Sequence, residues 1–121
     1  MSFMFEKLDV YQKSVDFADE IIALALDFPR GYYFLAEQLN RAALSIATNL
    51  AEGNGRFTKN DRKNFFTIAR GSVQECIPLI ELTRRRGLIP ETVNKNLRSQ
   101  LETIAKMISG LITGLDNREQ K

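Results

Sequence analysis

The sequence contains no histidine and no tryptophan, and only one cysteine among its 121 residues. Without histidine there is no Ser-His-Asp triad and no Cys-His pair. The absence also excludes zinc sites of the usual mixed type and di-iron sites built from Glu-x-x-His. A single cysteine cannot form an intramolecular disulfide, which is typical of the reducing cytoplasm. We therefore expect no cofactor, no metal and no catalytic residues, so that the protein is not an enzyme.

Long apolar runs are absent too. The sequence has no stretch of about 18 apolar residues, the length that could span a membrane. The first residues also lack the basic and apolar regions of a signal peptide. We therefore expect a cytoplasmic protein, with residues 1–121 forming a single domain. The net charge is +2, from 17 basic and 15 acidic residues. Such a small excess does not by itself indicate a nucleic-acid partner.

Apolar residues recur every three or four positions in four segments, which predicts four helices over residues 8–28, 32–52, 59–86 and 91–115. Thr58 has the position and chemistry of a helix start, with Asp61 three residues later. Gly53 and Gly87 are expected to end helices in the left-handed region. Because the connections are short, neighbouring helices should be antiparallel. The pattern predicts an all-α, up-down-up-down four-helix bundle.

The first helix carries apolar residues over a wide arc, more than a monomer requires. One set is assigned to the bundle core, namely Leu8, Tyr11, Val15, Ala18, Ile22 and Ala25. A second set is assigned to an oligomer interface, namely Val10, Phe17, Ile21, Leu24 and Phe28. The remaining arc is acidic and could face the basic third helix of a neighbour. Such a head-to-tail contact predicts a cyclic homo-oligomer.

Polar residues of the second and third helices are predicted to form an inter-helix network of Arg41, Ser45, Asn49, Glu52, Ser72 and Glu75. Folding these helices into a hairpin brings Arg41 to Glu75 and Ser45 to Ser72. We interpret the network as structural, fixing the register of the two helices. If the ion pair is buried, removing either partner should cost about 3–5 kcal/mol. The alternative is a ligand or catalytic site around Arg41, Glu52 and Glu75.

Basic residues gather near the turn between the second and third helices. Arg56, Lys59, Arg62 and Lys63 are candidate phosphate contacts, and Phe57 between them could stack on a base. The alternatives are an ordinary solvated end and a hydrophobic lid formed by Phe57. The predicted partners are a second copy of the chain and RNA or a ribonucleoprotein.

Two motifs occur in order, QLNRAALSIATNLAEGNGR at 38–56 and FFTIARGSVQE at 65–75. With FEKLDVYQKSVDFA at 5–18 and FPRGYYFLAEQL at 28–39, they resemble the 23S rRNA intervening sequence protein family of bacteria. The resemblance implies a four-helix bundle that forms ring-shaped homo-oligomers, often pentamers, and it assigns no catalytic residue. The fold is also similar to accessory proteins of diversity-generating retroelements, which partner a reverse transcriptase and nucleic acid. We expect a non-enzymatic adaptor for RNA or ribonucleoprotein; the alternative is a scaffold that binds only protein.

Overall fold

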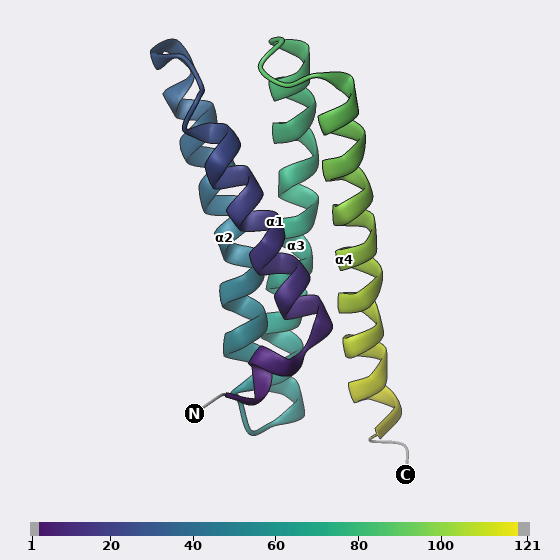
Figure 1. Ribbon diagram of the computed structural model, residues 1–121. Coiled ribbons are helices and arrows are strands. Elements are labelled where there is room, and N and C mark those ends of the chain that lie inside the picture. Colours follow the sequence, from purple (N-terminus) through teal and green to yellow (C-terminus); the bar gives the residue numbers. More distant parts are fainter. Residues whose placement is uncertain (1–2, 119–121) are drawn as a thin grey trace.

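The computed structural model describes residues 3–118, and every regular element within that range is helical. Four long helices lie side by side, and each runs opposite to the one before it in the sequence (Figure 1). They are α1 (Asp9–Ala25), α2 (Tyr33–Asn54), α3 (Lys59–Arg85) and α4 (Glu91–Arg118). Two short 3-10 turns precede α1 and α2, at Met4–Lys7 and Arg30–Tyr32.

Local signals explain several of the helix ends. The Thr58 hydroxyl accepts a hydrogen bond of 3.1 Å from the backbone N–H of Asp61, as an N-cap residue does. Gly87 follows α3 with φ of 73°, so it adopts the left-handed conformation expected there. α1 ends at Ala25, earlier than predicted, because the chain tightens before Pro29. Phe28 N–H bonds to the Ala25 carbonyl in an i to i−3 turn, and a residue before proline avoids helical geometry.

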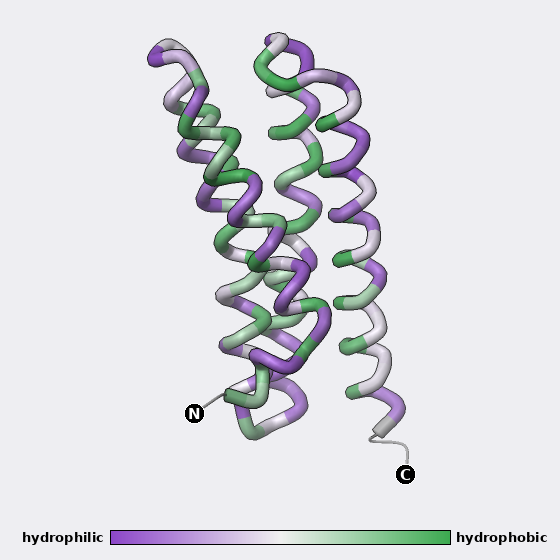
Figure 2. The backbone as a smooth tube through the Cα atoms, viewed as in Figure 1, coloured by the Kyte–Doolittle hydropathy of each residue, from purple (hydrophilic) through white to green (hydrophobic). Residues whose placement is uncertain are grey.

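The core lies between the four helices. Each helix contributes an apolar stripe, visible as recurring hydrophobic segments along the chain (Figure 2). The largest fully buried side chains of this core include Phe17, Ile46, Leu50, Leu101 and Ile104. Neither α1 and α3 nor α2 and α4 are in backbone contact, so these pairs lie diagonally across the bundle. Within residues 3–118, no helix is both long enough and apolar enough to cross a membrane.

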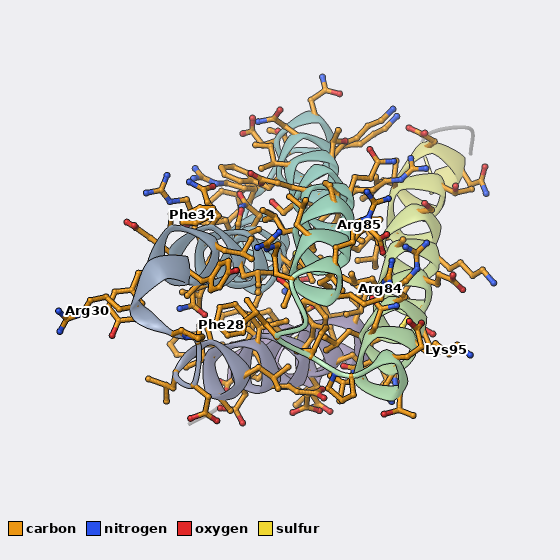
Figure 3. The ribbon with its side chains drawn as sticks, turned by 90° about the horizontal axis from the view of Figure 1, so that it is seen from above. Phe28, Arg30, Phe34, Arg84, Arg85 and Lys95 are labelled. Atoms are coloured by element: carbon orange, nitrogen blue, oxygen red, sulfur yellow. The ribbon has the colours of Figure 1, made fainter. Side chains whose placement is uncertain are left out.

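The interface role predicted for the second apolar set of α1 was wrong, and the core role predicted for the first set is confirmed only in part, for residues such as Ala18 and Ala25. Val10, Phe17, Ile21 and Phe28 are buried in the core of the same protomer, and Leu24 packs against that core. Figure 3 shows Phe28 pointing in among the helices. Two residues assigned to the core, Val15 and Ile22, are instead 40% and 36% exposed. Both sets have helical spacing, so spacing alone could not identify the inward one.

Gly53 also has a different role from the one predicted. It lies inside α2 and is buried, and α2 continues to Asn54. A Cβ atom at this position would lie 2.7 Å from Cε1 of Phe66 and 3.1 Å from Cβ of Phe65. Glycine is therefore needed because α3 comes very close, and not because the backbone turns left-handed. Gly55, which caps α2, has a φ of −85°.

Candidate functional site

The seam between α2 and α3 holds a directed chain of hydrogen bonds. Asn49 Nδ2 donates to Ser45 Oγ at 3.0 Å, and Ser45 Oγ lies 2.8 Å from Ser72 Oγ. Ser72 Oγ in turn donates to the backbone carbonyl of Ile68 at 3.1 Å. Since Ser72 uses its hydrogen on Ile68, Ser45 is the donor in the bond between the two hydroxyls. Each hydroxyl thus donates once and accepts once, so the chain is satisfied within the protein.

The ion pair predicted between Arg41 and Glu75 is absent. Both side chains are exposed, and neither makes an ion pair or a hydrogen bond within residues 3–118. Glu52 pairs with Arg56 on its own helix, at 2.9 Å. The Arg41 and Glu75 side chains lie outside the seam, where an ion pair between exposed groups would contribute little to stability. The polar network is therefore limited to Ser45, Asn49 and Ser72, and the alternative site around Arg41, Glu52 and Glu75 is not assembled.

The four candidate phosphate contacts do gather at one end of the bundle. Each of them is already engaged there by protein groups. The Arg56 guanidinium pairs with Glu52 and lies 4.6 Å from the centre of the Phe65 ring, while Arg62 Nε donates to the Arg56 carbonyl at 2.8 Å. These contacts turn the two arginines toward the protein. A phosphate would have to compete with them.

The two lysines of this group share one carboxylate, that of Asp116 on α4. Lys63 Nζ lies 3.0 Å from Asp116 Oδ1, and Lys59 Nζ lies 3.5 Å from it. The hydrogen bond from Lys63, helped by the charge of Lys59, holds the pKa of Asp116 below its ordinary value. Sequence reasoning did not connect Asp116 to this group, because the two lie far apart in the chain. Only the packing of α4 beside α3 brings them together.

A second cluster of charges lies at the opposite end, around the connection between α3 and α4. Arg84 and Arg85 both donate to the Glu81 carboxylate, at 2.8 Å and 2.9 Å, and these hydrogen bonds lower the pKa of Glu81 to about 2. Arg86 donates to the Tyr32 hydroxyl at 3.1 Å. Figure 3 shows Arg84 and Arg85 at this end, while Arg30 extends away on the far side. The cluster ties α3 to its neighbours.

Reactive groups in the described chain are few. Cys76 is fully buried, and burial, helped by the charge of Glu75, raises the pKa of its thiol to about 12. Such a thiol is not a nucleophile at neutral pH. Between α1 and α4 lies a hollow of about 270 Å³, with polar residues such as Lys13, Asp16 and Asn96 in its lining. Among residues 3–118, no three histidine, cysteine or acidic side chains are grouped as metal ligands would be.

The resemblance seen in the sequence is confirmed by a family model, that of the 23S rRNA-intervening sequence protein, which matches residues 6–110. The chain belongs to this family. None of the curated proteins matches it. A crystal structure from Bacteroides thetaiotaomicron, described as a protein of unknown function from the S23 ribosomal protein family, has the same fold with a TM-score of 0.80. It is 24% identical, and the alignment covers 86% of this chain and 95% of that one.

Both motifs of this family member lie where α2 and α3 pack together. They contribute the serines of the seam, Gly53 and the buried alanines Ala42 and Ala69. The motif residues thus account for close helix packing and do not build a ligand site. Asp116, which holds the two lysines, lies beyond the residues that the family model matches.

Proposed function

We propose that this family member is a non-enzymatic subunit that self-associates into a closed ring and acts as an adaptor through its outer faces. The proposal rests on the distribution of the exposed large apolar side chains over the helices. Eight of them belong to α1, α2, α3 and the residue following α1, and none lies on the described part of α4. They are Val15, Ile22, Leu26, Tyr33, Phe34, Leu44, Ile68 and Leu82.

Apolar side chains concentrated in this way favour contact with another protein. The family resemblance favours a ring of identical subunits, often five. Sedimentation velocity across a micromolar concentration range tests the assembly, and we expect a defined oligomer. A chain that sediments as a monomer throughout that range would overturn the proposal.

The proposal includes no enzymatic role because the candidate nucleophiles are buried or already hydrogen-bonded. The thiol of Cys76 is buried with a raised pKa. The hydroxyls of Ser45 and Ser72 are used in the seam, where no general base is within the same hydrogen-bond chain. A nucleophile without an adjacent base or a lowered pKa is not activated.

Binding of RNA is a second candidate function, favoured by Phe57. This side chain is 100% exposed in the turn between α2 and α3, beside the four basic residues described above. An exposed aromatic ring next to basic groups can stack on an unpaired base. However, Arg56 and the two lysines already have carboxylate partners, so an RNA phosphate would have to displace Glu52 and Asp116 from them.

A salt titration of binding to a structured RNA tests this second candidate. Phosphate contacts predict a steep loss of affinity as salt rises. Phe57→Ala should weaken binding of unpaired bases, and Phe57→Tyr is the matched control because it keeps the ring. No binding at low salt would eliminate the RNA role and leave a scaffold that binds only protein.

A further inference from the structure

Besides the eight exposed apolar residues on the sides of the bundle, three more lie at one of its ends. They are Phe3, Met4 and Phe57, which are 60%, 77% and 100% exposed. Phe3 and Met4 belong to the N-terminal segment, and Phe57 lies in the connection between α2 and α3. Both segments lie at the same end of the bundle (Figure 1). A fully exposed phenyl ring contributes nothing to the core, so the apolar surface of Phe57 is available to a partner.

A surface hollow of about 710 Å³ lies between these two segments, and we call it the end hollow. Phe5 of the N-terminal turn and Phe57 both line it, together with Ala51 and Gly55 at the end of α2. The volume falls within the range of ligand sites, which is about 300–1,000 Å³. The end hollow thus offers two phenyl rings from segments that are distant in the sequence.

The Phe5 ring is held in place by its neighbours. Its centre lies 5.0 Å from that of the Tyr11 ring, edge to face, and 5.8 Å from that of the Phe3 ring, against which it stacks. Gln12 Nε2 donates to the Glu6 carbonyl at 2.8 Å, which ties the N-terminal turn to α1. A partner therefore does not have to order this wall of the end hollow, which lowers the entropy cost of binding.

The charged groups that line the end hollow are Glu52, Arg56 and Asp61. Glu52 and Arg56 pair with each other at 2.9 Å. The Asp61 carboxylate forms no ion pair or hydrogen bond within residues 3–118. The charge left unpaired in the lining is therefore negative. It attracts a cationic group of a partner and repels a phosphate.

The other charged side chains that the structure describes at this end balance one another. They are the bases Lys7, Lys59, Arg62 and Lys63 and the acids Glu6, Asp9 and Asp116. Lys59 and Lys63 hold Asp116, and Arg62 lines a separate hollow of about 120 Å³ beside α4. Lys7 has an acid on either side of it in the chain. None of these groups supplies a cation to the lining of the end hollow.

We propose that the end hollow binds a short protein segment in which a large apolar side chain lies next to a lysine or arginine. The apolar side chain contacts Phe5 and Phe57, and the cation pairs with Asp61. This inference rests on the proposed adaptor role and gives that role a site and a partner chemistry. It assigns Phe57 to a protein partner and not to an RNA base. None of the eight apolar residues on the sides of the bundle lines the end hollow, so a subunit can bind the segment and self-associate at once.

Selection from a random peptide library displayed on phage tests the chemistry of the partner. The wild-type protein is the bait, and peptides that also bind the Phe57→Ser variant are removed first. We expect the enriched peptides to share a large apolar residue next to lysine or arginine. The inference is overturned if no peptide is enriched, or if the enriched peptides lack a basic residue.

The affinity of one selected peptide for matched variants tests the site. Phe57→Ala should weaken binding by more than about tenfold, as at an interface hot spot. Asp61→Asn should also weaken it, and the difference from the wild type should shrink as salt rises. Phe34→Ala and Glu102→Gln are the controls, because they remove the same groups from exposed positions elsewhere. Equal losses in the variants and their controls would overturn the site.

Two further measurements separate this site from the other functions considered. Phe57→Ala should sediment as the wild type does, and a loss of assembly in that variant would show that another copy of the chain occupies the end hollow. A single-stranded RNA oligonucleotide of mixed sequence should not compete with the selected peptide. Competition that depends on Phe57 would assign the end hollow to RNA, and either result would overturn the inference. A monomeric wild type that still binds the peptide would instead overturn only the proposed ring.

Discussion

Two sides of this bundle differ in how closely their helices approach. Across the α2–α3 seam lie serines, buried alanines and Gly53, whose Cα faces the Phe66 ring. Between α1 and α4 the side chains that line the gap are mostly polar and of mixed size, from Ser99 to Lys13, and a hollow of about 270 Å³ remains. The bond from Gln100 to Glu20 crosses this side at 2.8 Å.

The difference shows that small residues accompany the close approach of α2 and α3, while polar residues line the looser side between α1 and α4. Small residues let backbones come together and exclude water, so a short hydrogen bond between hydroxyls is held in place there. Between α1 and α4 the mostly polar side chains instead line an open hollow. We therefore expect substitutions at the seam to have large effects and those in the hollow to have small ones.

The largest expected difference is in thiol reactivity. Cys76 lies in the buried half of α3 with its pKa raised from 9.0 to about 12, which reduces the thiolate about a thousandfold at a given pH. Ser99→Cys places a second thiol in the lining of the hollow, where it should have an ordinary pKa. A thiol reagent at pH 8 should therefore modify only one thiol of the folded Ser99→Cys protein.

The wild type is the control for this experiment. It should react only after denaturation, when Cys76 is exposed. Reaction of the folded wild type at the rate of the denatured protein would contradict the closed packing around α3.

Gly53→Val should give the largest loss of stability at the seam. Its side chain would overlap the Phe66 ring, and overpacking of this kind lowers the free energy of unfolding by about 1–3 kcal/mol. Urea denaturation measures the change. The matched control is Gly110→Ala on α4, where an added Cβ meets nothing within 4 Å. It should raise the free energy of unfolding by up to about 1 kcal/mol, because alanine favours the helix. Equal effects at the two glycines would be evidence against close contact at Gly53.

Ser72→Ala should have a smaller effect. It removes the acceptor for Ser45 and the donor to the Ile68 carbonyl, and one lost hydrogen bond lowers the free energy of unfolding by about 0.5–1.5 kcal/mol. A double-mutant cycle with Ser45→Ala should reveal coupling. Strictly additive losses would show that the two hydroxyls do not interact.

Gln100→Ala should have the smallest effect of the four. It removes the hydrogen bonds to Glu20 and Asn96, but these groups are accessible to water, which can replace them. We expect the free energy of unfolding to change by less than about 0.5 kcal/mol. A loss comparable with that of Ser72→Ala would remove the contrast between the two sides.

Features that depend on neighbouring residues in the chain could be predicted from the sequence. The cap at Thr58 and the left-handed Gly87 involve groups only a few positions away. The contact between Ser45 and Ser72 could also be predicted, because a short connection fixes the register of a helical hairpin. In contrast, Lys63 and Asp116 meet only because α4 packs beside α3. Nothing in the spacing of either segment indicates that contact.

The sequence by itself determined the four helices, most of their ends and the small residues of the α2–α3 seam, since helical periodicity and capping are local properties. Only the tertiary structure decided which side of α1 faces inward. Phe17 and Ile22 both belong to stripes of helical spacing, and yet Phe17 is fully buried while Ile22 is 36% exposed. An isolated helix with two apolar stripes has no inside. The inside is defined by where α2 and α4 lie, because burial is a relation between helices and not a property of one of them.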